Sequence, residues 1–312
     1  MTADLNTLKD SYLALRRSSG YRLDETEYHI RTFISWLDTE RADRAEFTVA
    51  DALEWACQHG GQTIGHVKRL GSIRGWTTYA HAHDPAIPVI PAGLLTAPQM
   101  RPAPYIYLED DIEAVMEVFA RRADNGRTWP SRWTDRTYQV LTGLLACTGM
   151  RVGEAIGLNR DQVDMDTGWI KVATEKTGRE RLVLLHPTSL RELGAYLDDP
   201  ARPAVAAPEP LFVSASGRRV GYTLYQKNFH AATIEADLKH QGRAKPTIHG
   251  LRHTFAVRQL AAAYREGADP ARRLTLLSTW LGHVSPNNTY WYLTATPELL
   301  GGAADLVEQD RR

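Results

Sequence analysis

The stretch Thr148-Gly149-Met150-Arg151-Val152-Gly153-Glu154 decides the fold when it is taken with three shorter pieces that follow it. Those pieces are Lys176-Thr177-Gly178, His249-Gly250-Leu251-Arg252 and Leu281-Gly282-His283, and Tyr292 stands nine residues after His283. Each piece alone means little. Together, and in this order, they supply two arginines, one lysine, two histidines and one tyrosine, a set of side chains that suits a single phosphodiester.

This order of motifs resembles the catalytic domain of the tyrosine recombinases, the phage integrase family of DNA strand transferases, over about the last two thirds of the chain. The family pattern is arginine, lysine, His-x-x-Arg, Leu-Gly-His and then tyrosine. The resemblance therefore implies six catalytic residues, all present here: Arg151, Lys176, His249, Arg252, His283 and Tyr292. It also implies an N-terminal helical core-binding domain of the SAM-like type before the catalytic domain, with the two domains clamped round DNA.

The composition is that of an ordinary globular protein. The 312 residues suffice for about two domains, and no apolar run approaches the roughly 20 residues that a membrane span requires. The N-terminus lacks the features of a secretory signal and two cysteines make no disulfide framework, so we expect a cytoplasmic protein that contacts no membrane. Lys plus Arg and Asp plus Glu both number 37, so DNA binding must depend on local positive charge, with acidic residues facing away from the duplex.

Residues 1–88 are predicted to form a small helical domain. Apolar residues recur at helical spacing in the segments 5–15, 24–36, 48–57 and 63–79. Asp24 is the expected N-cap of the second segment, and Thr48 with Asp51 forms a loose capping box for the third. On periodicity alone, a four-helix unit with solvated charges is favoured over a DNA-binding one.

A proline-rich segment follows this domain. Prolines at positions 85, 88, 91, 98, 102 and 104 interrupt any helix and stiffen an extended chain. We therefore expect residues 89–104 to link the first domain to a catalytic domain of residues 105–312.

The second domain is predicted to be mainly α with a small antiparallel β-sheet. Helical patterns cover residues 108–121, 134–145 and 152–158, and Cys147 is expected in the core because it lies in an apolar run. Residues 169–173 and 181–185 resemble strands, and residues 174–180 suit the turn of a hairpin. After Pro187 the chain is expected to be helical to its end, with Gly282 as a helix C-cap.

The sequence also indicates how some of these side chains are held. Arg151 opens a short helix, which predicts a guanidinium at a fixed, buried point, and Glu154 on the same face either orients it or forms an ordinary ion pair. His249 and Arg252 are three residues apart and share one face of a predicted helix. Taken singly, each of these residues has a common alternative role in surface charge, capping or packing.

The resemblance implies a role for each catalytic residue. Tyr292 would attack the phosphodiester and form a 3′-phosphotyrosine, while Arg151 and Arg252 offset the charge on the non-bridging oxygens. Lys176 would protonate the 5′-oxygen, His249 would accept a proton near the nucleophile, and His283 would donate a hydrogen bond to the phosphate. No metal, cofactor or ATP is expected. Tyr290 is the rival nucleophile, but the nine-residue interval favours Tyr292.

The expected partner is double-stranded DNA, cut and rejoined at specific sites during integration, excision or transposition. Candidate DNA contacts are Lys68, Arg69, Arg74, Arg243 and Lys245. The family implies a homo-tetramer on two DNA sites. The protein without DNA could still be a monomer. An apolar stripe from Leu299 to Val307 is expected to pack on a neighbouring subunit or on its own domain. The rival functions are a type IB topoisomerase and a DNA-binding protein that no longer cuts.

Overall fold

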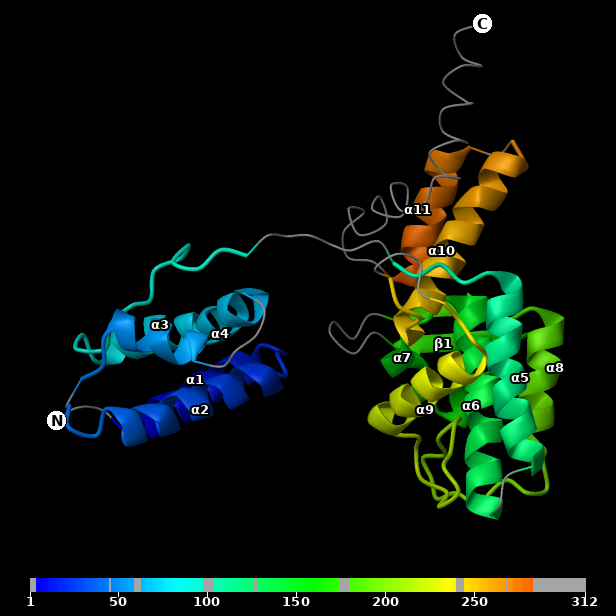
Figure 1. Ribbon diagram of the computed structural model, residues 1–312, viewed down its shortest axis with the longest axis horizontal. Coiled ribbons are helices and arrows are strands. Elements are labelled where there is room, and N and C mark those ends of the chain that lie inside the picture. The colour runs from blue at the N-terminus through cyan, green and yellow to red at the C-terminus, as the bar shows by residue number, and fades with distance from the viewer. Residues whose placement is uncertain are drawn as a thin grey trace, which may run out of the picture. The chain divides into compact units, whose positions relative to one another are not determined.

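The chain forms two compact units, Met1–Arg101 and Pro102–Arg312 (Figure 1). The computed structural model describes residues 4–44, 46–58, 63–97, 104–125, 128–173, 180–239, 244–267 and 269–282. Over these residues the fold is mainly α with one small antiparallel sheet, as predicted. The boundary between the units falls within the proline-rich segment. None of the described helices is long and apolar enough to cross a membrane.

The described part of the first unit contains four helices: α1 (Leu5–Ser18), α2 (Asp24–Glu40), α3 (Val49–Cys57) and α4 (Thr63–His83). Their apolar faces meet in one core, in which the Phe33 ring lies 5.1 Å from that of Trp55 and 6.3 Å from that of Trp76. Ile90, from the start of the proline-rich segment, is also buried in this core. The four helices predicted in this unit are therefore confirmed, and the last of them ends at His83.

The helix starts in this unit agree only partly with the sequence patterns. The capping box is confirmed, because the Thr48 N–H donates to Asp51 Oδ2 at 2.7 Å and the Asp51 N–H donates to Thr48 Oγ1 at 3.2 Å. The N-cap predicted at Asp24 is wrong. Asp24 is already helical, and Leu23 precedes it in the left-handed conformation at φ 61°.

The second unit is built from seven α-helices, one 3₁₀ turn and a hairpin over its described residues. The helices are α5 (Glu109–Asn125), α6 (Trp129–Thr148), α7 (Val152–Gly157), α8 (Pro187–Leu197), α9 (Tyr222–Glu235), α10 (Ile248–Arg265) and α11 (Pro270–Leu281), and the 3₁₀ turn is η1 (Arg160–Gln162). Strands β1 (Trp169–Ala173) and β2 (Glu180–Leu184) pair antiparallel, with Trp169 opposite Leu184 and Ala173 opposite Glu180. The predicted hairpin turn falls at residues 174–179, outside the described residues.

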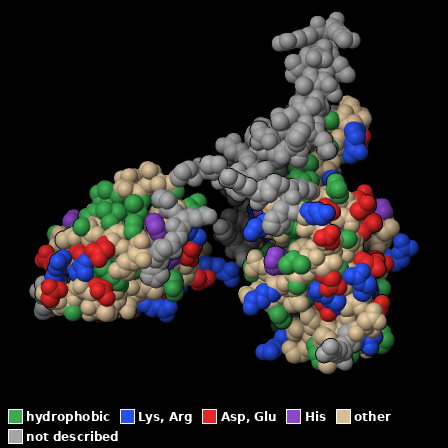
Figure 2. All heavy atoms as spheres, viewed as in Figure 1, with side chains coloured by type: hydrophobic (Ala, Val, Ile, Leu, Met, Phe, Trp, Pro, Cys, Tyr) green, Lys and Arg blue, Asp and Glu red, His purple; other side chains and the backbone are tan. Residues whose placement is uncertain are grey.

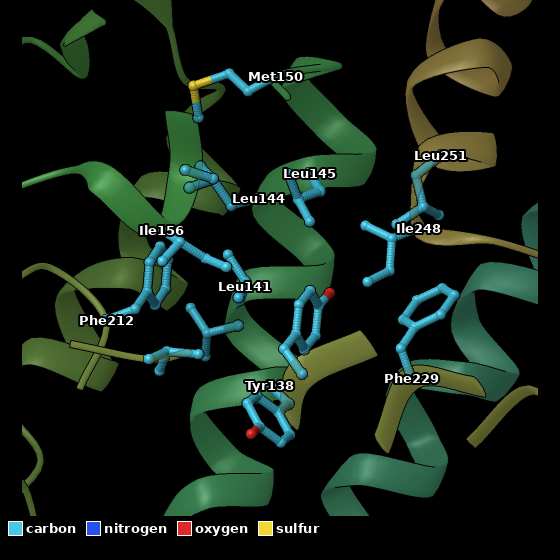
Figure 3. Close-up of a cluster of buried hydrophobic side chains, with 14 of the residues drawn as sticks. Tyr138, Leu141, Leu144, Leu145, Met150, Ile156, Phe212, Phe229, Ile248 and Leu251 are labelled. Atoms are coloured by element: carbon cyan, nitrogen blue, oxygen red, sulfur yellow. The ribbon is translucent and has the colours of Figure 1, made fainter. Parts of the chain in front are cut away.

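Helix α6 runs through the core of this unit. Figure 3 shows its Leu141, Leu144 and Leu145 between Ile156 and Phe212 on one side and Ile248, Leu251 and Phe229 on the other. The core thus joins α6 directly to α7 and α10, the two helices that begin beside the predicted catalytic arginines. Burial of these side chains fixes the starts of α7 and α10 relative to each other.

Two features of the second unit differ from the sequence predictions. Residues 198–221 were expected to be helical but contain no helix, because their apolar residues 211–213 are completely buried in the core. Pro210 and Val213 form isolated bridges to Asn159 and Arg219 instead. Cys147 is exposed rather than in the core, and it lines a pocket with Ser189 and Leu193 of α8.

Glycines at the ends of α6 and α11 bring these two helix ends together. Gly149 and Gly282 both cap their helices in the left-handed conformation, at φ 64° and 65°. A Cβ at Gly149 would lie 2.5 Å from a ring carbon of Phe255 on α10, so only glycine fits there. Figure 1 shows α10 and α11 side by side at one end of the unit. The predicted C-cap at Gly282 is confirmed.

Candidate active site

Three arginines converge on the C-terminal end of α11. The three successive backbone carbonyls of residues 280–282 each accept a hydrogen bond from a different arginine. Arg181 Nε reaches the first at 2.7 Å, Arg252 Nη2 the second at 2.7 Å, and Arg151 Nη2 the third at 3.5 Å. The partial negative charge at a helix C-terminus favours cations at this place. The chain continues from this end directly into His283.

Arg252 is the most deeply buried of the three arginines. Only 2% of the residue is exposed, and its Nη1 donates to the Gly149 carbonyl at 2.8 Å while Nη2 donates to that of Leu281. It lies in the first turns of α10, whose N-cap Thr247 accepts the N–H of Gly250 at 3.1 Å. Arg252 therefore joins the ends of α6 and α11 from a fixed position on a third helix.

Arg151 is less buried than the sequence predicted, because its side chain remains 39% exposed. It is the N-cap residue of α7, and its backbone N–H donates to Glu154 Oε2 at 2.9 Å while its Nη1 donates to Oε1 at 2.8 Å. Burial favours the neutral form of Glu154, but hydrogen bonds and charge from Arg181 and Arg151 outweigh it and lower the pKa of this carboxyl. Glu154 is thus a buried carboxylate that holds Arg151 in place.

His249 lies beside these arginines on the first turn of α10. Partial burial lowers the pKa of the His249 imidazole, because it disfavours the charged form. The positive charges of Arg252 and Arg151 lower this pKa further. Its outer surface is exposed, and its ring lies edge-on to that of His253 at 4.5 Å. A neutral imidazole in this position can accept a proton near neutral pH.

The lowered pKa predicts that DNA cleavage tolerates mild acid if His249 is the proton acceptor. The His249 imidazole binds a proton more readily in the unfolded chain than in the folded one. The stability that neutral His249 contributes is therefore complete above about pH 6.5 and declines as the pH falls below that value. Activity declines over the same acidic range, because a protonated His249 cannot accept a proton. Single-turnover cleavage measured between about pH 5 and 8 should show an acid limb with an apparent pKa below about 6.5. His249→Gln should remove this limb, and the exposed His186→Gln should not. A wild-type limb above that value would contradict the assignment.

Arg181 belongs to this cluster, although the sequence pattern predicted it only as a strand residue. Its Nη1 and Nη2 donate to the two oxygens of Glu154 at 3.1 and 2.7 Å, and its side chain is 9% exposed. In the structure Arg181 is on the same face of β2 as the buried Val183, but both faces of this strand are apolar in the sequence, so alternation alone did not reveal it. A charge that faces a core needs a partner.

The remaining predicted catalytic residues lie outside the described residues. These are Lys176, His283 and Tyr292, and the rival nucleophile Tyr290 and the apolar stripe from Leu299 to Val307 lie outside as well. The structure thus brings together Arg151, Glu154, His249 and Arg252. Lys176 lies in the segment that follows β1, and His283 and Tyr292 lie in the segment that follows Gly282.

The candidate DNA contacts are divided between the two units. On α4, Lys68 forms an ion pair with Glu25 at 2.7 Å, Arg69 donates to the carbonyl of Ala56 at 2.8 Å, and Arg74 is partly buried. In the second unit Lys245 is exposed before α10, and Arg243 lies outside the described residues. Figure 2 shows basic and acidic side chains interspersed over the visible face of the second unit, so this face does not separate the two charges.

Among the described residues, no group of three or more His, Cys, Asp or Glu side chains is arranged to hold a metal ion. The positive charge of the site comes from its arginines.

Residues 109–298 match the model of the phage integrase family. The chain is also 33% identical over 307 residues to y4rB of Sinorhizobium fredii, a protein named as an integrase/recombinase, with 96% of this chain and 95% of the relative covered. The match spans both units, so the first unit is shared with this relative as well.

Solved structures of low sequence identity share the fold. The Tn1549 transposon integrase in complex with transposon right end DNA has a TM-score of 0.64 at 17% identity, with 99% of both chains covered. A lambda integrase tetramer bound to a Holliday junction has a TM-score of 0.60 at 16% identity, over 90% of this chain and 78% of that one.

Proposed function

Because this chain belongs to the phage integrase family, we propose that it is a site-specific tyrosine recombinase, which cuts and rejoins double-stranded DNA through a 3′-phosphotyrosine. The observation that supports this most directly is the convergence of Arg151, His249 and Arg252 at the end of α11. Tyr292 follows Leu281, the last residue of α11, by eleven residues. A chain of that length can return a nucleophile to the arginines.

The residues have complementary roles in the proposed reaction. The Tyr292 oxygen attacks phosphorus as its proton passes to His249, and the bond to the 5′-oxygen breaks as Lys176 gives that oxygen a proton. Arg151 and Arg252 stabilise the charge that gathers on the non-bridging oxygens, and His283 donates a further hydrogen bond. Attack by a 5′-hydroxyl on the phosphotyrosine reverses these steps and joins the strands.

Covalent capture tests this function without knowledge of the target site. The full-length protein is incubated with nicked duplexes of random sequence, in which cleavage beside the nick releases a short oligonucleotide and prevents rejoining. We expect denaturant-resistant adducts joined through a 3′-phosphate and enriched in one sequence. Enrichment by binding without any adduct would indicate a DNA-binding protein that does not cut. Relaxation of plasmids lacking the enriched sequence would indicate a topoisomerase.

We propose further that the reaction requires neither metal nor ATP. Two guanidinium groups provide the positive charge that a divalent cation supplies in many nucleases. The phosphotyrosine conserves the phosphodiester linkage, so rejoining needs no other energy source. We expect cleavage of the enriched duplex to proceed at an unchanged rate in excess EDTA and without nucleotide. Loss of activity in EDTA that Mg²⁺ restores would refute this mechanism.

The proposed assembly is a homo-tetramer on two DNA sites, and the proposed location is the cytoplasm. The lambda integrase tetramer with a similar fold supports this number of subunits. Deletion of residues 297–312 removes the apolar stripe of the C-terminal tail and should spare binding to one site while weakening the two-site complex. Native gels with one-site and two-site DNA measure both. Normal two-site complexes would exclude the tail from assembly, and a truncated protein that unfolds would show that the tail packs on its own domain.

A further inference from the structure

Arg181 joins three parts of the second unit. Arg181 is the second residue of β2. Its Nε donates to the carbonyl of Trp280 at the end of α11, and Nη1 and Nη2 donate to the two carboxylate oxygens of Glu154 on α7. A Cβ at Gly282 would lie 3.1 Å from Arg181 Nη1, so the backbone of α11 passes close against this guanidinium. One side chain therefore sets the spacing between the hairpin, α7 and the end of α11.

The carboxylate that Arg181 binds is also the one that holds Arg151. Glu154 Oε1 accepts from Arg151 Nη1 at 2.8 Å and from Arg181 Nη1 at 3.1 Å. The two arginines are thus held on either side of one carboxylate, which is only 3% exposed. A movement of Glu154 must carry Arg151 with it, because both the backbone and the side chain of Arg151 are bound to it.

We propose that Arg181 is a positioning residue for the recombination chemistry, which orients Arg151 through Glu154. This inference rests on the proposed function. Nε, Nη1 and Nη2 of Arg181 each donate to Trp280 or Glu154, so its proposed role is exerted through Glu154 rather than on the DNA directly. Only a guanidinium can perform this task. A lysine carries one nitrogen and cannot bind both carboxylate oxygens and a carbonyl in different directions.

The test is a double-mutant cycle between Arg181→Lys and Arg151→Ala, with the nicked duplex enriched by the wild-type protein as the probe. Arg181→Lys should lower the single-turnover cleavage rate about 10²-fold, because misplacement of a catalytic group by about 1 Å has an effect of that size. DNA affinity in a gel-shift assay should change little. In the Arg151→Ala background, Arg181→Lys should cost almost nothing further, since the group that it orients is already gone.

Arg202 provides a matched control. It is similarly buried, at 10% of its side chain, pairs with Glu209 at 2.7 Å and donates to the carbonyl of Pro210 at 3.1 Å. Arg202→Lys should lower thermal stability as Arg181→Lys does, without a 10²-fold loss of cleavage, and its small effect should persist in the Arg151→Ala background.

The outcomes separate the inference from the function on which it rests. A full additional loss from Arg181→Lys in the Arg151→Ala background would overturn the positioning role, as would equal losses in Arg181→Lys and Arg202→Lys. If Arg181→Lys does not fold, Glu154→Gln takes its place in the same cycle, because it keeps the shape of Glu154 and removes its charge. Absence of any wild-type adduct would instead refute the proposed function.

Discussion

Tyr292→Phe is expected to abolish covalent attachment to DNA while leaving DNA binding close to normal. The substitution removes one oxygen, which is the proposed nucleophile, and leaves the aromatic ring for packing. Without that oxygen no phosphotyrosine can form, so the expected loss is complete rather than graded. The measurement is the yield of denaturant-resistant adduct on the nicked duplex, with a gel-shift titration of the same DNA.

Tyr290→Phe is the matched control, because it removes the same atom two residues away. On a helix the two side chains would point about 200° apart, so they cannot easily substitute for each other. Tyr290→Phe should retain the adduct. Undiminished adduct in Tyr292→Phe together with its loss in Tyr290→Phe would reassign the nucleophile.

Arg252→Ala should lower the cleavage rate at least 10²-fold and also destabilise the protein. Removal of one donor to a developing oxyanion typically costs about 3 kcal/mol, which accounts for the rate. The fold loses the bonds to the carbonyls of Gly149 and Leu281, and each bond from a charged donor contributes about 1.5–3 kcal/mol. Single-turnover cleavage and thermal unfolding are the two measurements. Arg252→Lys should restore neither the cleavage rate nor the stability fully, because an ammonium group cannot donate the paired hydrogen bonds of a guanidinium.

Two other alanine variants separate the catalytic from the structural effect. Arg219 also donates to two backbone carbonyls, those of Ile156 and Leu158, at 2.7 and 2.8 Å. Arg219→Ala should therefore destabilise the protein without a comparable loss of cleavage below its melting temperature. Arg151→Ala should lose cleavage at least 10²-fold with a smaller loss of stability, because Arg151 is more exposed. Mild effects on cleavage in both Arg151→Ala and Arg252→Ala would mean that these arginines are structural.

The sequence predicted the elements of this site better than it predicted their packing. Glycine in the left-handed conformation is almost the only residue that ends a helix so sharply, so the breaks at Gly149 and Gly282 could be predicted from residue type alone. The capping box at Thr48 depends on two residues three positions apart, so it could also be predicted from the sequence. The hairpin was visible as two apolar runs with a turn between them.

The contacts that hold the site together could not be predicted in this way, because they join residues far apart in the chain. Both faces of the second strand carry apolar residues, so alternation did not decide which way Arg181 points. Its pairing with Glu154 spans 27 positions, and the bond of Arg252 to Gly149 spans 103. The non-helical stretch 198–221 was missed for a similar reason. Its apolar residues 211–213 are buried by tertiary packing, and Pro210 and Val213 form isolated bridges rather than part of a helix.

The double attachment of Arg252 has an evolutionary consequence. A residue that served only the reaction would be free to drift once a copy of the gene was no longer selected for recombination. Arg252 also fastens two helix ends, so selection for a folded protein alone would retain it, whereas the only role proposed for the Tyr292 hydroxyl is in the reaction. Among relatives of this chain, an intact arginine at this position is therefore weak evidence that a copy is still active, and the tyrosine is the more informative residue to inspect.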